Sequence, residues 1–262
     1  MSGWDALSPS QRAASRAYVD ARSAERSHLV VALSGSHAFG FASPDSDVDL
    51  KCVHVAPTRA LVGLERADGT MNQLVTVDGV EVDYTSNEVG VFLAGVLSGN
   101  GNYIERVFGP MPLVEDACVA GLRPLLRAAL SRRVARHYAG FATSQRKLME
   151  SSSAPTAKRA LYVLRTLLTG ATLLREGAVV TDVGVLFAAT GFDEAGELIE
   201  RKRSGERAAF DASELPRWGA LMDRAKSALE TAERESALPE SPPPEAVEAI
   251  DAWLLALRRA RW

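Results

Sequence analysis

The chain has 262 residues, of which 47% are hydrophobic, 24% charged and 6% aromatic, so its length accommodates one large domain or two modest ones. Thirty Lys and Arg against thirty-three Asp and Glu give a net charge of −3, which excludes a uniformly basic nucleic-acid coat. The charge is uneven, because residues 119–176 carry eleven basic and two acidic residues while the rest of the chain balances to −12. A basic middle between acidic ends predicts a face that binds an anion.

The two cysteines, Cys52 and Cys118, form no C-x-x-C pair. We therefore expect reduced thiols rather than a disulfide framework or a structural zinc site. The N-terminal residues are polar, and no stretch approaches the roughly 20 apolar residues of a membrane span. We expect no signal peptide, no membrane association and a cytoplasmic location.

The first part of the chain predicts short alternating helices and strands. Ser8-Pro9-Ser10 is typical of a helix start, and this helix is expected to end near Ala24. Asp78-Gly79 indicates a type I′ hairpin turn. The other expected elements are a strand at 28–33, a helical turn at 37–41, a strand at 47–55, hairpin strands at 74–77 and 80–85, and helices at 89–97 and 103–108.

From residue 119 onward the periodicity is helical, with almost no strand signal. Helices are expected at 122–149, 158–176, 218–236 and 245–262, with Pro- and Ser-rich connections at 151–155 and 239–244. The fold class predicted is α+β: a small mixed β-sheet domain with helices on one side (residues 1–118), followed by an all-helical domain (residues 119–262) that frames a cleft.

Two carboxylates carry the strongest chemical signal. Asp47 and Asp49 are two residues apart in the expected strand 47–55, so both side chains point to one face, about 6–7 Å apart at Cα. Like charges this close are unfavourable without a cation, and Mg²⁺ prefers carboxylates combined with substrate phosphates. The alternative is a solvated strand face, although Asp is disfavoured in strands.

A glycine-serine pair precedes these carboxylates by about ten residues. Gly35 lets the backbone approach a ligand closely, and Ser36 opens a helical turn whose N–H groups can hold an anion. Glu81 and Asp83 share a face of the strand after the hairpin, so either could be a third carboxylate, and we choose Asp83. These parts suit phosphoryl or nucleotidyl transfer through metal ions.

Gly35-Ser36 followed by Asp47-Val48-Asp49 resembles the polymerase-β-like nucleotidyltransferase superfamily. The longer string GSHAFGFASPDSDVDLKCVHV is similar to the RlaP-type group, predicted nucleotidyltransferases associated with bacterial RNA-repair operons. VDYTSNEVGVFLAGVLSGNGNYIERVFG and KRALYVLRTLLTGATLLREG resemble later segments of that group. The resemblance covers about residues 29–177 and departs at Gly101-Asn102, where Asn-Pro is more usual.

The resemblance implies roles for individual residues. Asp47 and Asp49 would bind two Mg²⁺ ions, with Mn²⁺ as a substitute, and Asp83 would complete the metal site and help deprotonate the acceptor hydroxyl. Gly35 and Ser36 would hold the β- and γ-phosphates of ATP or another NTP. Ser43 and Ser46 either contact the nucleotide or cap the turn before the strand.

The basic segment supplies the remaining candidates. Lys158, Arg159 and Arg165 lie on one expected helix that has few acidic neighbours, so we expect them to bind the triphosphate or the acceptor, with a solvated face as the alternative. Arg132 and His137 match the short Arg-x4-His signature of HEPN-type ribonucleases, which is weak evidence in an Arg-rich helix.

The leading hypothesis is a metal-dependent nucleotidyltransferase that moves a nucleoside monophosphate from an NTP to an acceptor hydroxyl. The resemblance favours an RNA end as the acceptor, in repair. One alternative keeps the chemistry but modifies a protein or small-molecule hydroxyl, as antitoxin-like and antibiotic-modifying relatives do. Another is a non-catalytic nucleotide-binding module, against which the three carboxylates argue.

Overall fold

Two groups of residues pack separately in the computed structural model, which describes residues 3–64, 68–205 and 208–262. Unit 1 comprises residues 1–35, 47–131 and 241–262, and unit 2 comprises residues 36–46 and 132–240. The sequence suggested one boundary after residue 118, but three segments depart from it, since residues 119–131 pack with the sheet unit and two more distant segments also change sides. Residues 36–46 pack with the helical unit, where Val183 N donates to Phe39 O (3.0 Å), and residues 241–262 pack with the sheet, where Arg258 pairs with Glu88 (2.6 Å).

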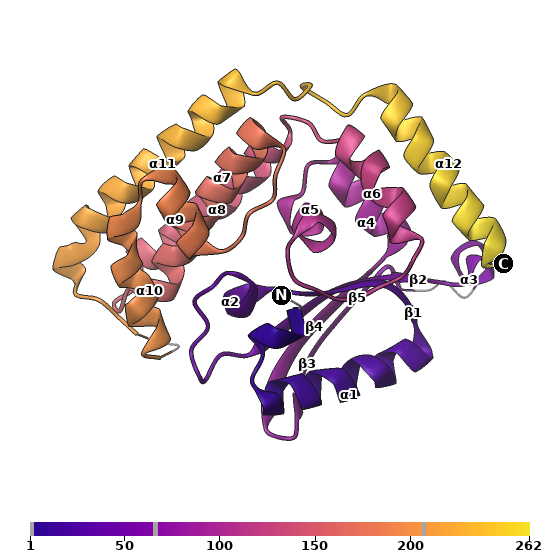
Figure 1. Ribbon diagram of the computed structural model, residues 1–262, viewed down its shortest axis with the longest axis horizontal. Coiled ribbons are helices and arrows are strands. Elements are labelled where there is room, and N and C mark those ends of the chain that lie inside the picture. Colours follow the sequence, from indigo (N-terminus) through magenta and orange to yellow (C-terminus); the bar gives the residue numbers. More distant parts are fainter. Residues whose placement is uncertain (1–2, 65–67, 206–207) are drawn as a thin grey trace. The chain divides into compact units, whose positions relative to one another are not determined.

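Unit 1 is built on a mixed five-stranded sheet of order β3-β4-β2-β1-β5 (Figure 1). The strands β2 and β4 are parallel, and the other neighbouring pairs are antiparallel. This sheet and the helical C-terminal part confirm the predicted α+β class. The strand bounds are Ser27–Leu33 (β1), Val48–Val55 (β2), Thr70–Val77 (β3), Val80–Glu88 (β4) and Pro112–Glu115 (β5).

The hairpin between β3 and β4 forms at the predicted turn. Asp78 has φ of 48° and Gly79 has φ of 79°, the positive values that a type I′ turn requires at both central residues. The turn sets the pairing of the two strands from Val77↔Val80 outward. It thereby fixes which residues of β3 and β4 lie opposite each other.

Helices cover both faces of this sheet, whereas the sequence suggested one. Tyr18 and Val19 of α1 pack with Leu50 and Tyr84 in the core on one face, and α4 contacts β2 and β4 on the other (Figure 1). Ser8 caps α1 as predicted, its Oγ accepting from Gln11 N (3.3 Å). The helices of this unit are η1 (Gly3–Ala6), α1 (Pro9–Glu25), α3 (Thr58–Val62), α4 (Val89–Leu97), α5 (Gly101–Phe108), α6 (Val119–Ala128) and α12 (Pro244–Ala260).

Unit 2 packs around α8, in which fifteen of twenty residues are buried. Apolar residues on all sides of α8 are in contact with α7, α9, α10 and α11. The expected helix 122–149 is two helices, because the chain turns at residues 129–133. The elements of this unit are α2 (Gly35–Ala38, beginning at the last residue of unit 1), α7 (Val134–Glu150), α8 (Ala157–Glu176), α9 (Val183–Thr190), η2 (Asp193–Ala195), α10 (Gly196–Arg203), η3 (Ala212–Glu214) and α11 (Leu215–Glu235).

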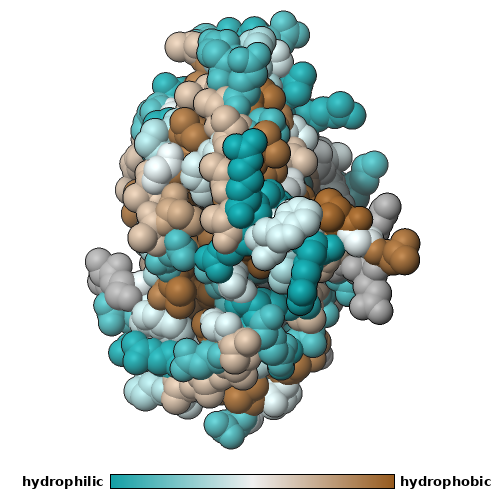
Figure 2. Space-filling model, turned by 90° about the vertical axis from the view of Figure 1, so that its right-hand side faces the viewer, coloured by the Kyte–Doolittle hydropathy of each residue, from teal (hydrophilic) through white to brown (hydrophobic). Residues whose placement is uncertain are grey.

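The surface mixes hydrophilic and hydrophobic side chains, as the face in Figure 2 shows. Large exposed hydrophobic residues such as Val62, Leu74 and Leu255 come from different elements, which is ordinary for a protein surface. Within the described residues, no helix combines the length and the apolar character that crossing a membrane requires.

Candidate active site

Asp49 and Asp83 are direct neighbours on the parallel strands β2 and β4. Residues paired across adjacent strands point to the same face of a sheet, so the two carboxylates lie side by side. Their side chains are 17% and 39% exposed, which leaves both open to a ligand. The structure thus brings together one member of the predicted Asp47/Asp49 pair and the chosen third carboxylate.

Lys51 joins these two carboxylates, and sequence reasoning missed it. Its Nζ lies 3.0 Å from Asp83 Oδ2 and 3.7 Å from Asp49 Oδ1, and it donates to Thr85 Oγ1 at 3.3 Å. The sequence could have indicated this residue, because side chains two residues apart on a strand point to the same face, so Lys51 shares a face with Asp49. One ammonium group therefore already offsets part of the charge of the two carboxylates.

Asp47 and Glu81 lie at the end of the strands next to this pair. The β2–β4 ladder begins at Val48↔Val82, so Asp47 immediately precedes β2, which begins one residue later than the predicted strand 47–55, and Glu81 lies on β4 just before the ladder. Asp47 is half-buried and Glu81 is exposed. Asp47 is two residues from Asp49 in the chain but is not part of the hydrogen-bonded ladder. Its role as a metal ligand stays a prediction.

Gly35 lies against Asp49, at a position that strongly favours glycine. Its φ of +60° is strained for other residues, and a Cβ at this position would overlap Asp49 Oδ2. Ser34 N donates to Asp49 O (2.9 Å), which ties the end of β1 to β2. The glycine-serine turn and the carboxylate thus meet because one position lacks a side chain.

Ser36 begins the loop of residues 36–46, hereafter the signature loop. Its side chain is 1% exposed, and among the described residues its Oγ has no hydrogen-bond partner. A buried hydroxyl without a partner costs free energy unless a ligand or water satisfies it. A phosphate oxygen is one acceptor that this hydroxyl could satisfy, and the role of Ser36 in phosphate binding stays a prediction.

Ser43 and Ser46 are held by a residue far along the chain. Lys202 of α10 is fully buried, and its Nζ donates to Ser43 Oγ (2.6 Å) and Ser46 Oγ (3.1 Å). The two hydroxyls also lie 3.0 Å apart. Both serines are therefore anchored within unit 2, and no local sequence pattern pointed to Lys202.

The basic helix α8 contacts the signature loop through Arg165. This side chain is 3% exposed, and its guanidinium carbon lies 4.0 Å from the centre of the Phe39 ring. This cation–π contact holds the signature loop against α8. Because the guanidinium is buried, it presents little charge to solvent. Lys158 and Arg159, in the first turn of α8, are half-buried and so retain access to solvent.

The comparisons with known proteins identify the family of the chain. The family described as "RNA repair pathway DNA polymerase beta family" (RlaP) matches residues 17–256. The chain belongs to the RlaP family. It is also 25% identical over 166 residues to Uncharacterized protein MJ0002 of Methanocaldococcus jannaschii, covering 63% of this chain and 68% of that one. A nucleotidyltransferase-like protein from Exiguobacterium sibiricum aligns with a TM-score of 0.34 and 14% identity over 95% of this chain and 79% of the other.

Membership of a polymerase-β-type family makes this RlaP protein a nucleotidyltransferase. Enzymes of this type generally use divalent metals. Within the described part of the chain, no group of three or more His, Cys, Asp or Glu side chains is arranged to hold a metal ion. Asp49 and Asp83 nevertheless fit one, because both are hard oxygen donors and already share a cation, the Lys51 ammonium.

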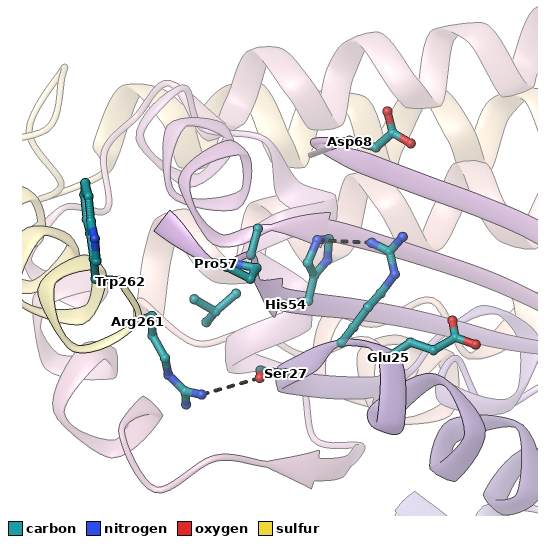
Figure 3. Close-up of a pocket in the computed structure, with 10 residues that line it drawn as sticks. Glu25, Ser27, His54, Pro57, Asp68, Arg261 and Trp262 are labelled. Atoms are coloured by element: carbon teal, nitrogen blue, oxygen red, sulfur yellow. Dashed lines mark hydrogen bonds between the residues drawn. The ribbon is translucent and has the colours of Figure 1, made fainter. Parts of the chain in front are cut away.

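A hollow of about 530 Å³ in the same unit lies elsewhere in this RlaP protein (Figure 3). It is lined by Glu25–Ser27, His54–Pro57, Asp68, Arg261 and Trp262. Val55 is six residues beyond Asp49 along β2, so the hollow lies roughly 20 Å from the carboxylates. Its arginines have separate partners, since Arg26 Nη1 donates to His54 Nε2 (3.3 Å) and Arg261 Nη1 to Ser27 Oγ (3.4 Å). This hollow is therefore not the site of the predicted chemistry.

Proposed function

We propose that this RlaP-family nucleotidyltransferase moves a nucleoside monophosphate from an NTP, ATP among them, to the hydroxyl at an RNA end, and that it needs Mg²⁺. In this reaction the acceptor oxygen forms a bond to the α-phosphorus. The bond from the α-phosphorus to the bridging oxygen breaks, and pyrophosphate leaves with that oxygen. The acceptor proton passes to a base.

The observation that carries the proposal is the pairing of Asp49 with Asp83 while Gly35 lies against Asp49. Asp49 lies on β2, Asp83 lies on β4, and Gly35 lies in the turn after β1. The mixed sheet brings these three elements together. Two carboxylates lie on one face of the sheet, and the turn beside them contains a glycine, which leaves space for a ligand. This arrangement suits a phosphate-bearing substrate with its cation. Bound Mg²⁺ would neutralise triphosphate charge and make the acceptor hydroxyl easier to deprotonate.

The residues of the chain have distinct tasks in this proposal. Asp49 and Asp83, with Asp47 beside them, hold the cation, and Asp83 accepts the acceptor proton as the more exposed carboxylate. The orphaned Ser36 hydroxyl and the N–H groups after Gly35 donate to the triphosphate. Lys202 holds the signature loop so that Ser36 keeps its position.

The basic segment supports an RNA acceptor. Residues 119–176 carry a local charge of +9, and Lys158 and Arg159 keep access to solvent. Backbone phosphates of RNA are anions that such a segment attracts. Action in the cytoplasm accords with an enzyme that consumes NTPs and repairs RNA.

Incubation of the protein with each α-³²P-labelled NTP, Mg²⁺ and three acceptor pools tests the proposal. The pools are RNAs with 3′-hydroxyl ends, cellular protein and small-molecule alcohols. We expect label on the RNA, with pyrophosphate released in equal amount. Label on protein or on a small molecule would establish the alternative acceptors instead. NTP binding without transfer to any pool would indicate a non-catalytic nucleotide-binding module.

A further inference from the structure

Lys51 is not an ordinary surface ion pair. Its side chain is 22% exposed and its Nζ is shared among the Asp83 carboxylate at 3.0 Å, the Asp49 carboxylate at 3.7 Å and the Thr85 hydroxyl at 3.3 Å. The register explains this sharing, because Asp49 pairs with Asp83 and Lys51 with Thr85, so all four residues lie on one face. The sheet register therefore places Lys51 next to both carboxylates.

A divalent cation at Asp49 and Asp83 would need the oxygens that Lys51 now contacts. Two cations within about 4 Å of the same carboxylates repel each other, so the ammonium and the metal compete. Lysine carries its charge on a flexible four-carbon stem with three donors, and it can turn to another anion at little conformational cost. The phosphate oxygens of an NTP are such an anion.

We propose that Lys51 is a positioning residue that makes metal binding conditional on NTP. Without substrate, its ammonium holds Asp49 and Asp83 together and competes with metal. When metal arrives with an NTP, the ammonium leaves the carboxylates and donates to a phosphate oxygen. This inference rests on the proposed function, since it assigns the cation and the triphosphate to the same carboxylate face.

As a consequence, binding of the metal ion is coupled to binding of NTP through Lys51. Metal without NTP must displace the ammonium and leave it without an anionic partner, so it binds weakly. Metal with NTP supplies that partner, so it binds more tightly. Removal of the Lys51 charge should therefore strengthen binding of the metal alone and reduce the gain that NTP brings.

The test is Mn²⁺ binding, with and without α,β-methylene-ATP, followed by the loss of the electron paramagnetic resonance signal of free Mn²⁺ relative to a protein-free sample that holds the same Mn²⁺ and analogue. The variants are Lys51→Met and Lys51→Gln, which remove the charge, and Lys51→Arg, which keeps it. The matched control is Lys226→Met on α11, where an exposed lysine pairs with Glu230 one helical turn later. Circular dichroism establishes folding, and either neutral variant suffices if the other does not fold.

We expect both neutral variants to bind Mn²⁺ alone about 10-fold more tightly than wild type, within the roughly 5–150-fold range of coupled sites. The analogue should strengthen Mn²⁺ binding about 10-fold in wild type and in Lys51→Arg. In the neutral variants the analogue should strengthen Mn²⁺ binding much less. A merely structural lysine would lower stability and leave this ligand dependence unchanged. That result, with Mn²⁺ alone binding equally to all variants, overturns the inference.

The two proposals fail differently. If wild type binds Mn²⁺ with the analogue but Lys51→Met and Lys51→Gln bind Mn²⁺ alone no more tightly, only the role of Lys51 is wrong. If wild type does not bind Mn²⁺ even with the analogue, the proposed function is wrong and the role of Lys51 with it.

Discussion

The Nζ of Lys202 lies 2.6 Å from the Oγ of Ser43, although 159 residues separate them in the chain. The same ammonium also reaches Ser46 Oγ at 3.1 Å, and the lysine is fully buried. A buried ammonium is costly unless hydrogen bonds compensate it, so this contact is specific. It fixes the part of the signature loop that leads into Asp47.

Lys202→Met should loosen the signature loop. Methionine fills a similar volume but donates nothing, so we expect a loss of about 1–3 kcal/mol in the free energy of unfolding. The KM for NTP should rise more than kcat falls, because Ser36 belongs to the same loop. Urea denaturation and steady-state kinetics measure both effects, with Lys226→Met as the exposed control. An unchanged KM would show that Lys202 serves stability alone.

Gly35→Ala should abolish transfer, because a Cβ there overlaps the Asp49 carboxylate. Displacement of a reacting group by about 1 Å costs roughly 100-fold in rate, and we expect at least that loss in kcat/KM. Gly79→Ala is the matched control: it has a similar positive φ of +79° but no atom within 4 Å of an added Cβ. It should cost about 1–2 kcal/mol in stability and leave activity intact. Equal activity in the two variants would contradict the account.

Local patterns predicted the parts of the site that are close in sequence. Asp78-Gly79 sets the hairpin, and the strand period places Asp49 on one face of β2 and Asp83 on one face of β4. The pairing of those two residues depends on a parallel register between strands that do not follow each other directly, which no local pattern contains. Lys202 was missed for the same reason, since its partners Ser43 and Ser46 lie 159 and 156 residues away.

The boundary between the parts of the chain was also beyond local patterns. Composition changes at residue 119, but the C-terminal helix α12 returns to the sheet unit through Arg258 and Glu88, whose side chains are 14% and 4% exposed. A polar pair of this kind leaves no hydrophobic pattern in the sequence. The sequence therefore does not indicate which unit α12 packs against. The roles expected of a catalytic region 1–118 and a helical region 119–262 stay predictions.

Acid should destabilise the fold through His28 and His54. Burial, assisted by Arg26, lowers the pKa of each histidine from 6.5 to about 4. As pH falls from about 6.5 towards 4, the unfolded state binds protons that the folded state does not, so stability decreases. Each histidine contributes at most about 1.4 kcal/mol per pH unit within that window, and solvent screening lowers this value. Urea denaturation between about pH 7 and pH 4 should show a shallower decline for His54→Gln, and a parallel decline would disprove the assignment.

Charge reversal on α8 should weaken RNA binding. Lys158→Glu with Arg159→Glu removes two half-buried cations, whereas Arg165 is unsuitable because it packs on Phe39. The salt dependence of binding to single-stranded RNA should flatten by about 0.7 for each phosphate that the variant no longer neutralises. Fluorescence anisotropy at several salt concentrations measures this slope.

The matched control for α8 changes net charge equally at two exposed positions, Lys226→Glu with Arg259→Glu. Arg258 is avoided because its ion pair with Glu88 holds α12. We expect a salt slope like that of wild type in the control. Equal flattening in both double variants would mean that only net charge matters and that α8 is not the RNA-binding surface.

The most direct measurement compares NTP labelled at the α-phosphate with NTP labelled at the γ-phosphate, each incubated with Mg²⁺ and RNA ending in a 3′-hydroxyl. Nucleotidyl transfer predicts that only the α-label reaches RNA and that the γ-label leaves as pyrophosphate. Asp49→Asn and Asp83→Asn should each abolish transfer while melting close to wild type, and Glu81→Gln should retain it. Transfer of the γ-label, or substantial α-label transfer by Asp49→Asn, would contradict nucleotidyl transfer at the Asp49–Asp83 pair.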